Sequence, residues 1–327
     1  MIFPARVNAG DEIRVIAPAR QLSIVSQSVI DIATARLEKM GFMVSFGRHV
    51  TSQGLLSAPT KQRLFDLHEA FTDPNVRIIL SAIGGFNSNE ILEGINFDLI
   101  RKNPKFLIGY SDVTALQNAI YARTGLVTYS GPHFSSFGES EGFEYTEDYF
   151  MKIVKGEGPL ELFASAQWSA DKWYKNQNER KFIPNAGFKI LQPGSTQGTI
   201  IGGNLCTLNL LQGTKYMPDL RDAILFLEDD ELGLAHIGLL ARNLASLIQQ
   251  PGFDKVKAMV FGRFHPDSDI DDERLAEVLR SFPALSKLPI ICGVDFGHTD
   301  PKITFPVGGR ASIVATSNEI KLTLLDY

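Results

Sequence analysis

The stretch Phe106-Leu-Ile-Gly-Tyr-Ser-Asp-Val-Thr-Ala-Leu-Gln-Asn-Ala-Ile-Tyr-Ala-Arg-Thr-Gly125 joins a short apolar run to a helical pattern. Its first three residues predict a buried strand, and Val113, Leu116 and Ile120 recur at the spacing of one helix face. The final glycine can take the left-handed conformation that closes a helix. Ser111 is therefore expected on a tight turn, where the following backbone N–H groups point toward a developing oxyanion. The position also suits a helix cap, so this stretch alone leaves both roles open.

The bulk composition is that of an ordinary globular protein. The chain has 327 residues, 44% of them hydrophobic and 21% charged, and this length favours two domains. A formal charge of -5 gives no support for a nucleic-acid partner. The N-terminal residues lack the pattern of a signal peptide, and no apolar run approaches the roughly 18 residues of a membrane helix. We therefore expect a cytoplasmic protein without a membrane partner.

The cysteines and histidines give no sign of a metal site. Cys206 and Cys292 both lie in apolar stretches, which predicts reduced core residues. Neither has a second cysteine or a histidine at metal-ligand spacing, so we expect no metal and no cofactor.

Strands and helices alternate along the first part of the chain. The stretch Glu12-Ile-Arg-Val-Ile-Ala-Pro predicts a first strand, which is followed by a helical pattern that ends near Met40 and then by a second strand, 42–46. This strand–helix–strand order predicts a parallel sheet. Thr60 resembles the cap of the next helix, and Val76–Leu80 predicts the third strand. The second half is less regular, and residues 310–325 alternate as antiparallel strands do.

Three further features suit either a ligand-binding or catalytic site or a purely structural role. The pair Gly84 and Gly85 follows the third strand, where it permits close approach of a ligand or merely shapes a turn. A strand from Ala223 ends in carboxylates, beginning with Glu228, which suit either a site or a solvated loop. Residues 156–197 form a long connection that contains both tryptophans, and such a segment either covers a site or links two domains.

A serine nucleophile needs a base, usually a histidine that an acid orients. Six histidines are present. His298 lies in a loop of small polar residues directly after a predicted strand, where catalytic groups concentrate, so it is our first choice. His133, beside a proline in another loop, is the second.

Taken together, these motifs resemble the LD-carboxypeptidase family of serine peptidases. The resemblance spans nearly the whole chain, and its specificity lies in the order of motifs that are individually weak. The motifs are Arg63-Leu-Phe-Asp-Leu-His-Glu-Ala-Phe-Thr-Asp-Pro, Gly109-Tyr-Ser-Asp-Val-Thr-Ala-Leu, Thr124-Gly-Leu-Val-Thr-Tyr-Ser-Gly-Pro, Gly202-Gly-Asn-Leu, Leu225-Phe-Leu-Glu-Asp, Val260-Phe-Gly-Arg-Phe and Gly297-His-Thr-Asp-Pro.

The resemblance implies a catalytic triad in which Ser111 is the nucleophile, His298 the general base and Glu228 the acid that orients it. The backbone N–H of Asp112, with that of Gly85 or Gly84, would form the oxyanion hole. The residues expected to contact substrate are Asn87, Trp168, Trp173 and Asn204. Family members are commonly homodimeric, cytoplasmic and independent of metals.

The resemblance also implies an α/β fold in two parts. Residues 1–160 would form an N-terminal parallel-sheet, flavodoxin-like domain that carries the nucleophile. Residues 161–195 would form a connecting substrate loop with the two tryptophans. Residues 196–327 would form a mixed α/β domain with a small β-barrel-like sheet, carrying the acid and the histidine.

The family has two branches that act on different substrates, and the resemblance leaves both open. Muramoyl-tetrapeptide carboxypeptidases of peptidoglycan recycling usually carry Arg-Gly-Gly-Tyr-Gly at the oxyanion loop, whereas this chain has Ile83-Gly-Gly-Phe-Asn-Ser-Asn89. That version, together with the long tryptophan segment, is similar to the microcin C immunity branch, which cleaves aminoacyl-nucleotide amides. Aromatic rings on a loop can stack on a nucleobase, so we favour this branch over the muramoyl-tetrapeptide carboxypeptidases. We expect a Ser-His-Glu hydrolase that cleaves peptide or aminoacyl-nucleotide amide bonds. A non-catalytic small-molecule binding module is the remaining alternative.

Overall fold

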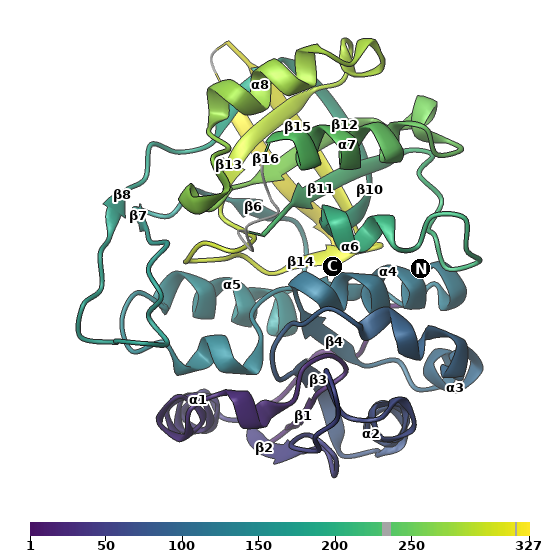
Figure 1. Cartoon of the computed structure of the whole chain (residues 1–327), viewed down its shortest axis with the longest axis vertical. Helices are drawn as coiled ribbons and strands as arrows, with labels where there is room; N and C mark the ends of the chain where they lie inside the picture. The colour runs from purple at the N-terminus through teal and green to yellow at the C-terminus, as the bar shows by residue number, and fades with distance from the viewer. Residues whose placement is uncertain (231–236, 318) are drawn as a thin grey trace.

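The computed structural model describes residues 1–230, 237–317 and 319–327. Two sheets with flanking helices form two lobes, drawn mainly in purple to teal and in green to yellow in Figure 1. We call them the N-terminal lobe and the C-terminal lobe, after the sheet at the centre of each. The predicted α/β class is confirmed. No helix in the described part of the chain combines the length and apolar character that a membrane crossing requires.

The sheet of the N-terminal lobe has the strand order β14-β5-β4-β3-β1-β2. Its members are β1 (Glu12–Ile16), β2 (Met43–Phe46), β3 (Val76–Ser81), β4 (Phe106–Gly109), β5 (Thr128–Ser130) and β14 (Phe305–Val307). The first five strands are parallel, and their order 2-1-3-4-5 is that of flavodoxin-like folds, as predicted. Strand β14 is antiparallel to β5 and comes from the far end of the chain, so the two lobes share this sheet.

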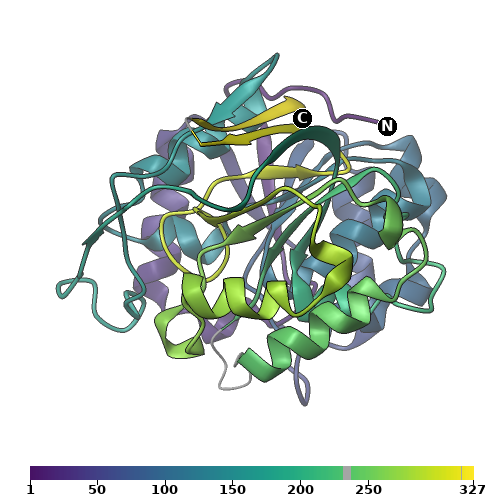
Figure 2. The same ribbon diagram turned by 90° about the horizontal axis from the view of Figure 1, so that it is seen from above.

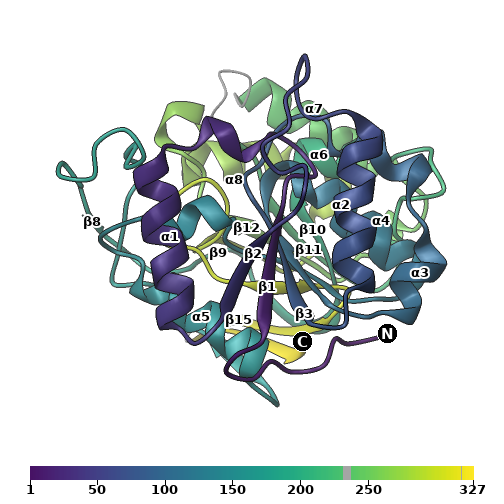
Figure 3. The ribbon, with the colours of Figure 1, turned by 90° about the horizontal axis from the view of Figure 1, so that it is seen from below.

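Helices cover both faces of this sheet (Figure 3). One face carries α1 (Gln27–Lys39) and α5 (Glu144–Lys155); the other carries α2 (Thr60–Thr72), α3 (Phe97–Lys102) and α4 (Thr114–Thr124). Alternation along each strand supplies both cores: Ile78 and Leu80 of β3 belong to the first, and Ile79 belongs to the second.

One local prediction needs correction. Thr60 is the first residue of α2 rather than its cap, because Pro59 holds the cap position with no side-chain hydrogen bond. The loop after the glycine pair leads into a 3₁₀ helix, η2 (Ser88–Gly94).

Helix α4 lies between the two lobes and is buried on almost every side. Eight of its eleven residues are buried. Its Asn118 amide donates a hydrogen bond to the Gly202 carbonyl oxygen, at 2.8 Å, and accepts one from the Gly202 N–H, at 3.3 Å. The helix that follows the turn of Ser111 is therefore joined directly to the backbone of the C-terminal lobe.

The sheet of the C-terminal lobe is mixed, as predicted. Its strand order is β6 (Leu160–Leu162), β16 (Glu319–Asp326), β15 (Arg310–Thr316), β10 (Gly194–Asn204), β11 (Ala223–Glu228), β12 (Ala258–Gly262), β13 (Ile290–Val294) and β9 (Lys189–Gln192). Strands β10 to β13 are parallel and the others pair antiparallel. Strand β9 also approaches β15, so the sheet curls toward the expected barrel-like form.

Three helices belong to this lobe: α6 (Leu205–Asn209), α7 (Ile237–Ile248) and α8 (Asp272–Arg280). Figure 2 shows α7 and α8 side by side. Of the cysteines, Cys292 is buried as predicted, but Cys206 is exposed, because it faces outward from the short helix α6.

The segment 161–195 runs along one side of both lobes, at the left of Figure 1. It contains a two-stranded ribbon of β7 (Gln167–Trp168) and β8 (Ile183–Pro184). Arg180, from this segment, forms a buried ion pair with Glu139 of the N-terminal lobe at 2.6 Å. The Ser165 N–H donates to the Asp295 carboxylate of the C-terminal lobe at 2.8 Å. The segment is thus fixed to both lobes, while the domain boundaries at 160 and 195 stay a prediction.

Candidate active site

Ser111 lies on a strained turn between β4 and α4. Its φ of +59° falls in the left-handed region, which is uncommon for a residue with a side chain. Residues Ser111–Val113 form a 3₁₀ turn that leads into α4. The Asp112 carboxylate accepts hydrogen bonds from the backbone N–H groups of Asn87 (3.0 Å) and Ser88 (2.9 Å). These bonds join the turn to the glycine loop after β3, so residues outside the turn stabilise its strained conformation.

Three of the predicted site residues converge at this turn. Ser111 Oγ lies 3.1 Å from His298 Nε2, and His298 Nδ1 lies 2.7 Å from Glu228 Oε2. Glu228 ends β11 and is 3% exposed, whereas His298 lies in the loop after β13. Both distances are those of hydrogen bonds, so the serine of one lobe meets the acid and the histidine of the other.

Gly297 makes room for this contact. Its φ is +104°, and a Cβ there would stand 3.0 Å from Glu228 Cβ and Oε2. A side chain at this position would displace the carboxylate that bonds the imidazole.

The glycine pair after β3 lies against Ser111. A Cβ on Gly84 would stand only 3.2 Å from Ser111 Cβ and 3.3 Å from its Oγ. The Gly84 carbonyl oxygen accepts a hydrogen bond from the Arg20 N–H at 3.3 Å. In a trans peptide the next N–H, that of Gly85, points the opposite way.

His133, the second-choice base, occupies a different place. Its ring is buried, and Nδ1 lies 2.6 Å from Ser81 Oγ, which is its hydrogen-bond partner among the described residues. Burial, with the nearby charges of Lys302 and His298, holds the pKa of His133 well below its usual range. Tyr110 stacks on this ring at 4.2 Å between centroids and meets His298 edge-on at 5.3 Å. His133 is therefore a neutral part of the floor of the site.

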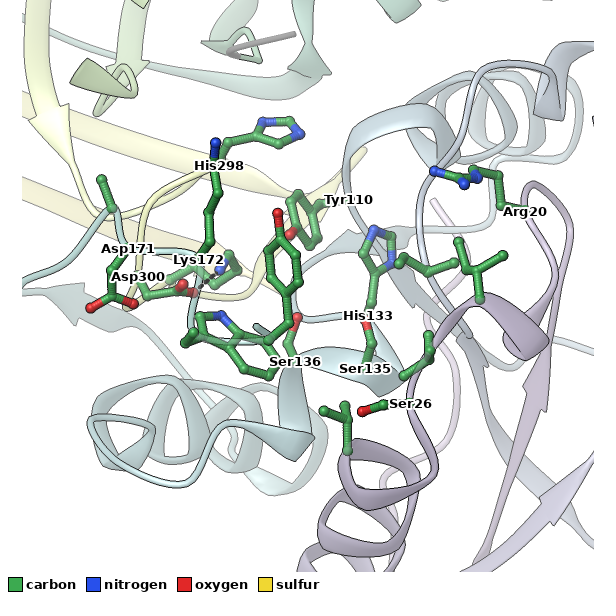
Figure 4. Close-up of a pocket in the computed structure, with 18 of the residues that line it drawn as sticks. Arg20, Ser26, Tyr110, His133, Ser135, Ser136, Asp171, Lys172, His298 and Asp300 are labelled. Carbon is green, nitrogen blue, oxygen red and sulfur yellow. Dashed lines mark hydrogen bonds and ion pairs between the residues drawn. The ribbon is translucent and has the colours of Figure 1, made fainter. Parts of the chain in front are cut away.

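Two hollows meet at these residues. The larger, of about 480 Å³, is walled by the segment 161–195 and the loop before α1, and the smaller, of about 200 Å³, contains Ser111 and the glycine pair. Figure 4 shows part of the shared wall, with Tyr110 and His133 lying between His298 and Arg20. The residues that line both hollows are Arg20, Ile83, Tyr110, His133 and His298.

Comparison with known proteins identifies the family. Residues 13–131 match the LD-carboxypeptidase N-terminal domain, and residues 197–313 match the LD-carboxypeptidase C-terminal domain. The chain belongs to the LD-carboxypeptidase family. It is 43% identical over 98% of both chains to YocD of Bacillus subtilis (strain 168), whose name describes a carboxypeptidase. It is 32% identical to the microcin C7 self-immunity protein MccF of Escherichia coli, over 98% of this chain and 96% of MccF.

A solved structure supports the same assignment. The crystal structure of an MccF-like protein from Bacillus anthracis str. Ames superposes with a TM-score of 0.99 at 48% identity and full coverage of both chains. The predicted activity class, a serine peptidase of the carboxypeptidase type, is therefore confirmed for this LD-carboxypeptidase family member.

The predicted substrate contacts lie in different surroundings. Trp173 lines the larger hollow, beside the exposed Tyr174. Trp168 instead packs under the Arg263 guanidinium, at 4.9 Å. The Asn87 amide donates to Ser57 and Glu90, and the Asn204 side chain caps α6 by accepting the Thr207 N–H at 3.0 Å. The geometry brings only Trp173 of these four to a hollow, and all four roles stay predictions.

The acidic run after β11 contains three other acids, Asp229, Asp230 and Glu231. Burial, together with the charges of Glu228 and Asp230, raises the pKa of Asp229 to about 7. Its carboxylate lies 3.5 Å from the Asn204 amide, whereas the imidazole bonds Glu228. Glu231, the third acid of this run, lies outside the described residues, as does His236. Within the described ranges, no group of three or more His, Cys, Asp or Glu residues could hold a metal ion.

Sequence reasoning missed two residues of the site, Tyr110 and Lys302. Tyr110 contacts the rings of both His133 and His298, and only its position directly before Ser111 could have drawn attention to it. Lys302 lies under the Tyr110 ring at 5.1 Å and pairs with Asp300. Burial works against its charge, but Asp300 and Tyr110 outweigh that effect, so the pKa of Lys302 is raised.

Proposed function

We propose that Ser111, His298 and Glu228 act as the catalytic triad of a serine hydrolase that cleaves the amide of aminoacyl nucleotides. One observation carries this proposal: an unbroken hydrogen-bonded series from Glu228 through His298 to Ser111, located where two hollows meet. A nucleophile, its base and the acid that orients the base are the parts that acyl transfer requires.

In the proposed reaction, Ser111 Oγ attacks the acyl carbon while His298 Nε2 accepts the hydroxyl proton. The imidazolium that forms donates from Nδ1 to the Glu228 carboxylate, which stabilises its charge. The C–N bond then breaks as His298 returns the proton to the leaving nitrogen. Water attacks the resulting ester with His298 again as base, which releases the acid and restores Ser111. General acid–base assistance of this kind contributes about 10²–10⁴-fold.

The N–H groups of Asp112 and Gly85 would stabilise the oxyanion. The Asp112 N–H opens the helical turn after the nucleophile. The Gly84 carbonyl is engaged by Arg20, which leaves the Gly85 N–H directed away from that contact. Each such donor is worth about 10²–10³-fold in kcat.

The choice of an aminoacyl nucleotide as substrate rests on the residues that line the larger hollow and on the ligands held by related proteins. Trp173 and Tyr174 place two aromatic rings beside a hollow next to the triad, where a nucleobase could stack. Solved structures of MccF, 29–30% identical with a TM-score of 0.89, hold glutamyl sulfamoyl guanosine and aspartyl sulfamoyl adenosine. The acyl group would then enter the smaller hollow with Ser111, and the nucleoside would leave through the larger.

A muropeptide is the second candidate substrate. A Bacillus subtilis protein named as a murein peptide carboxypeptidase is 32% identical over 95% of this chain, the same identity as MccF. A tetrapeptide would place its terminal residue, rather than a nucleoside, in the larger hollow.

A side-by-side assay tests the proposal. Purified protein is offered an aminoacyl sulfamoyl adenosine and a muropeptide tetrapeptide, with Ser111→Ala as the control in each case. We expect cleavage of the nucleotide substrate by the wild type and none by Ser111→Ala. Cleavage of the tetrapeptide alone would show that the substrate is a muropeptide rather than an aminoacyl nucleotide. Wild-type activity in Ser111→Ala would overturn the proposed catalytic triad.

A matched pair of tryptophan variants tests the stacking argument. Trp173→Ala should raise KM for the nucleotide substrate, while Trp168→Ala, whose ring is covered by Arg263, should change KM less. Equal KM values for both variants and the wild type would show that stacking on these rings does not contribute to binding of the nucleotide substrate. The predicted homodimer and cytoplasmic location are also part of this proposal, and light scattering and cell fractionation would test them.

A further inference from the structure

We propose that Arg20 binds an anionic, oxygen-bearing group of the substrate beside Ser111 and thereby determines which substrates the enzyme prefers. This inference rests on the proposed hydrolase function, because it assigns a recognition role at the same site.

Arg20 lies beside the space that a substrate bound at Ser111 would occupy. It follows β1, at the carboxyl end of the parallel strands, which is where ligands bind in open α/β sheets. Its exposed side chain lines both the larger and the smaller hollow. In Figure 4 it stands across the site from His298, with Tyr110 and His133 between them.

Arg20 differs in its pairing from the other cations at these hollows. Lys302 forms an ion pair with Asp300, and Lys172 lies 4.0 Å from Asp267. In the part of the chain that the structure describes, the Arg20 guanidinium has neither an ion pair nor a side-chain hydrogen bond with another residue. It is also the one arginine or lysine among the described residues that line the smaller hollow. Its five N–H donors are therefore available to a ligand.

The backbone of Arg20 is fixed to the oxyanion loop. Its N–H donates to the Gly84 carbonyl oxygen at 3.3 Å, and its N and Cγ stand 3.0 Å from where a Cβ on Gly85 would lie. The base of the side chain is thus held at a set position relative to Ser111. Less freedom is lost when a ligand binds to a side chain that is anchored in this way.

Guanidinium chemistry identifies the group that Arg20 would bind. Its planar fork matches the two oxygens of a carboxylate, or of a phosphoryl or sulfamoyl group, and forms paired charge-assisted hydrogen bonds. An aminoacyl nucleotide offers two sources of such oxygens: an acidic side chain on the acyl residue, and the group that joins the acyl nitrogen to the nucleoside. Both lie within a few bonds of the carbonyl that Ser111 attacks.

Binding measurements in the Ser111→Ala background separate these sources without turnover. Isothermal titration calorimetry with aspartyl sulfamoyl adenosine and alanyl sulfamoyl adenosine would compare the parent with Arg20→Met. We expect Arg20→Met to weaken binding roughly 10- to 100-fold, as loss of charge-assisted hydrogen bonds does. Loss confined to the aspartyl ligand assigns Arg20 to the acyl side chain, and equal loss for both ligands assigns it to the sulfamoyl group.

Two further variants make the test specific. Arg20→Lys keeps the charge but loses the fork, so its affinity should be intermediate. Arg77→Met removes an exposed arginine at the opposite, amino end of β3 and should leave both affinities unchanged. Unchanged affinity of Arg20→Met for both ligands would overturn the Arg20 inference alone. If the Ser111→Ala parent binds neither ligand and the wild type cleaves neither, the proposed function fails as well.

Discussion

Replacing Glu228 by Gln removes one charge from the site while keeping the size of the side chain. The Glu228 carboxylate lies 2.7 Å from His298 Nδ1 and is 3% exposed, so water screens the pair poorly. For two unit charges about 4 Å apart, an effective dielectric constant of about 20 gives roughly 4 kcal/mol. That interaction exists only when the imidazole is protonated, as it is during the attack by Ser111. Its loss therefore predicts a fall in kcat of about 10³-fold.

The assay is steady-state hydrolysis of an aminoacyl sulfamoyl adenosine, with kcat and KM measured separately. KM should change little, because Glu228 lies behind His298 and lines neither hollow. Asp229→Asn is the matched control: this neighbouring acid is also buried but bonds Asn204 rather than the imidazole, so the loss in kcat should be much smaller. Equal kcat for Glu228→Gln and the wild type, or a larger loss in Asp229→Asn, would refute the reasoning.

Three other perturbations probe the surroundings of the site. Gly297→Ala should lower kcat at least tenfold without unfolding the protein, because the new Cβ would displace Glu228; wild-type kcat would show that the loop adjusts freely. Asn118→Ala should lower the free energy of unfolding in urea by about 2–4 kcal/mol, since it breaks two buried hydrogen bonds between α4 and β10; a change below 0.5 kcal/mol would contradict that role. Because burial depresses the pKa of His133, folding favours its neutral form and the unfolded chain binds the proton more readily. The free energy of unfolding should therefore fall by about 1 kcal/mol per unit as pH drops below about 6, and His133→Gln should flatten this dependence.

Local sequence patterns predicted the parts of the fold that local chemistry decides. Largely apolar runs located β3, β4 and β11, because a strand that is covered on both faces has few polar residues; β1 was also predicted, although it includes the half-buried Glu12 and Arg14. Ser111 could be placed on its turn for the same reason. Its partners could not be chosen from spacing alone, since Glu228 and His298 lie more than a hundred residues away; the ordered motifs of the family resemblance selected them.

Features that depend on how the two lobes pack together could not be predicted from the sequence. Strand β14 crosses from the C-terminal part of the chain into the N-terminal sheet, and no local pattern indicates which sheet a three-residue strand will join. Arg20 resembled any other loop arginine, because its significance comes from the two hollows that it lines. Trp168 and Trp173 looked equivalent in sequence, yet only Trp173 lines the larger hollow.

The segment 161–195 contributes Trp173 and Tyr174 to the wall of the larger hollow but no member of the Ser111–His298–Glu228 series. Ser111 and Glu228 are aligned through α4, β10 and β11, where Thr114 accepts the Asn204 N–H and Asn204 is in register with Glu228. The backbone of the segment supports the His298 loop, because Ser169 and Asp300 exchange backbone hydrogen bonds at 2.7 and 2.9 Å. Substitutions of Trp173 and Tyr174, whose side chains line the larger hollow, can therefore alter what enters the site, whereas changes near Ser169 can displace the loop of His298. The side chains that line the larger hollow can thus change during evolution, and with them the preferred leaving group, while the backbone of the same segment keeps the His298 loop in place. A protein engineer who wants a new leaving group would randomise Trp173 and Tyr174 and leave Ser165 and Ser169 unchanged.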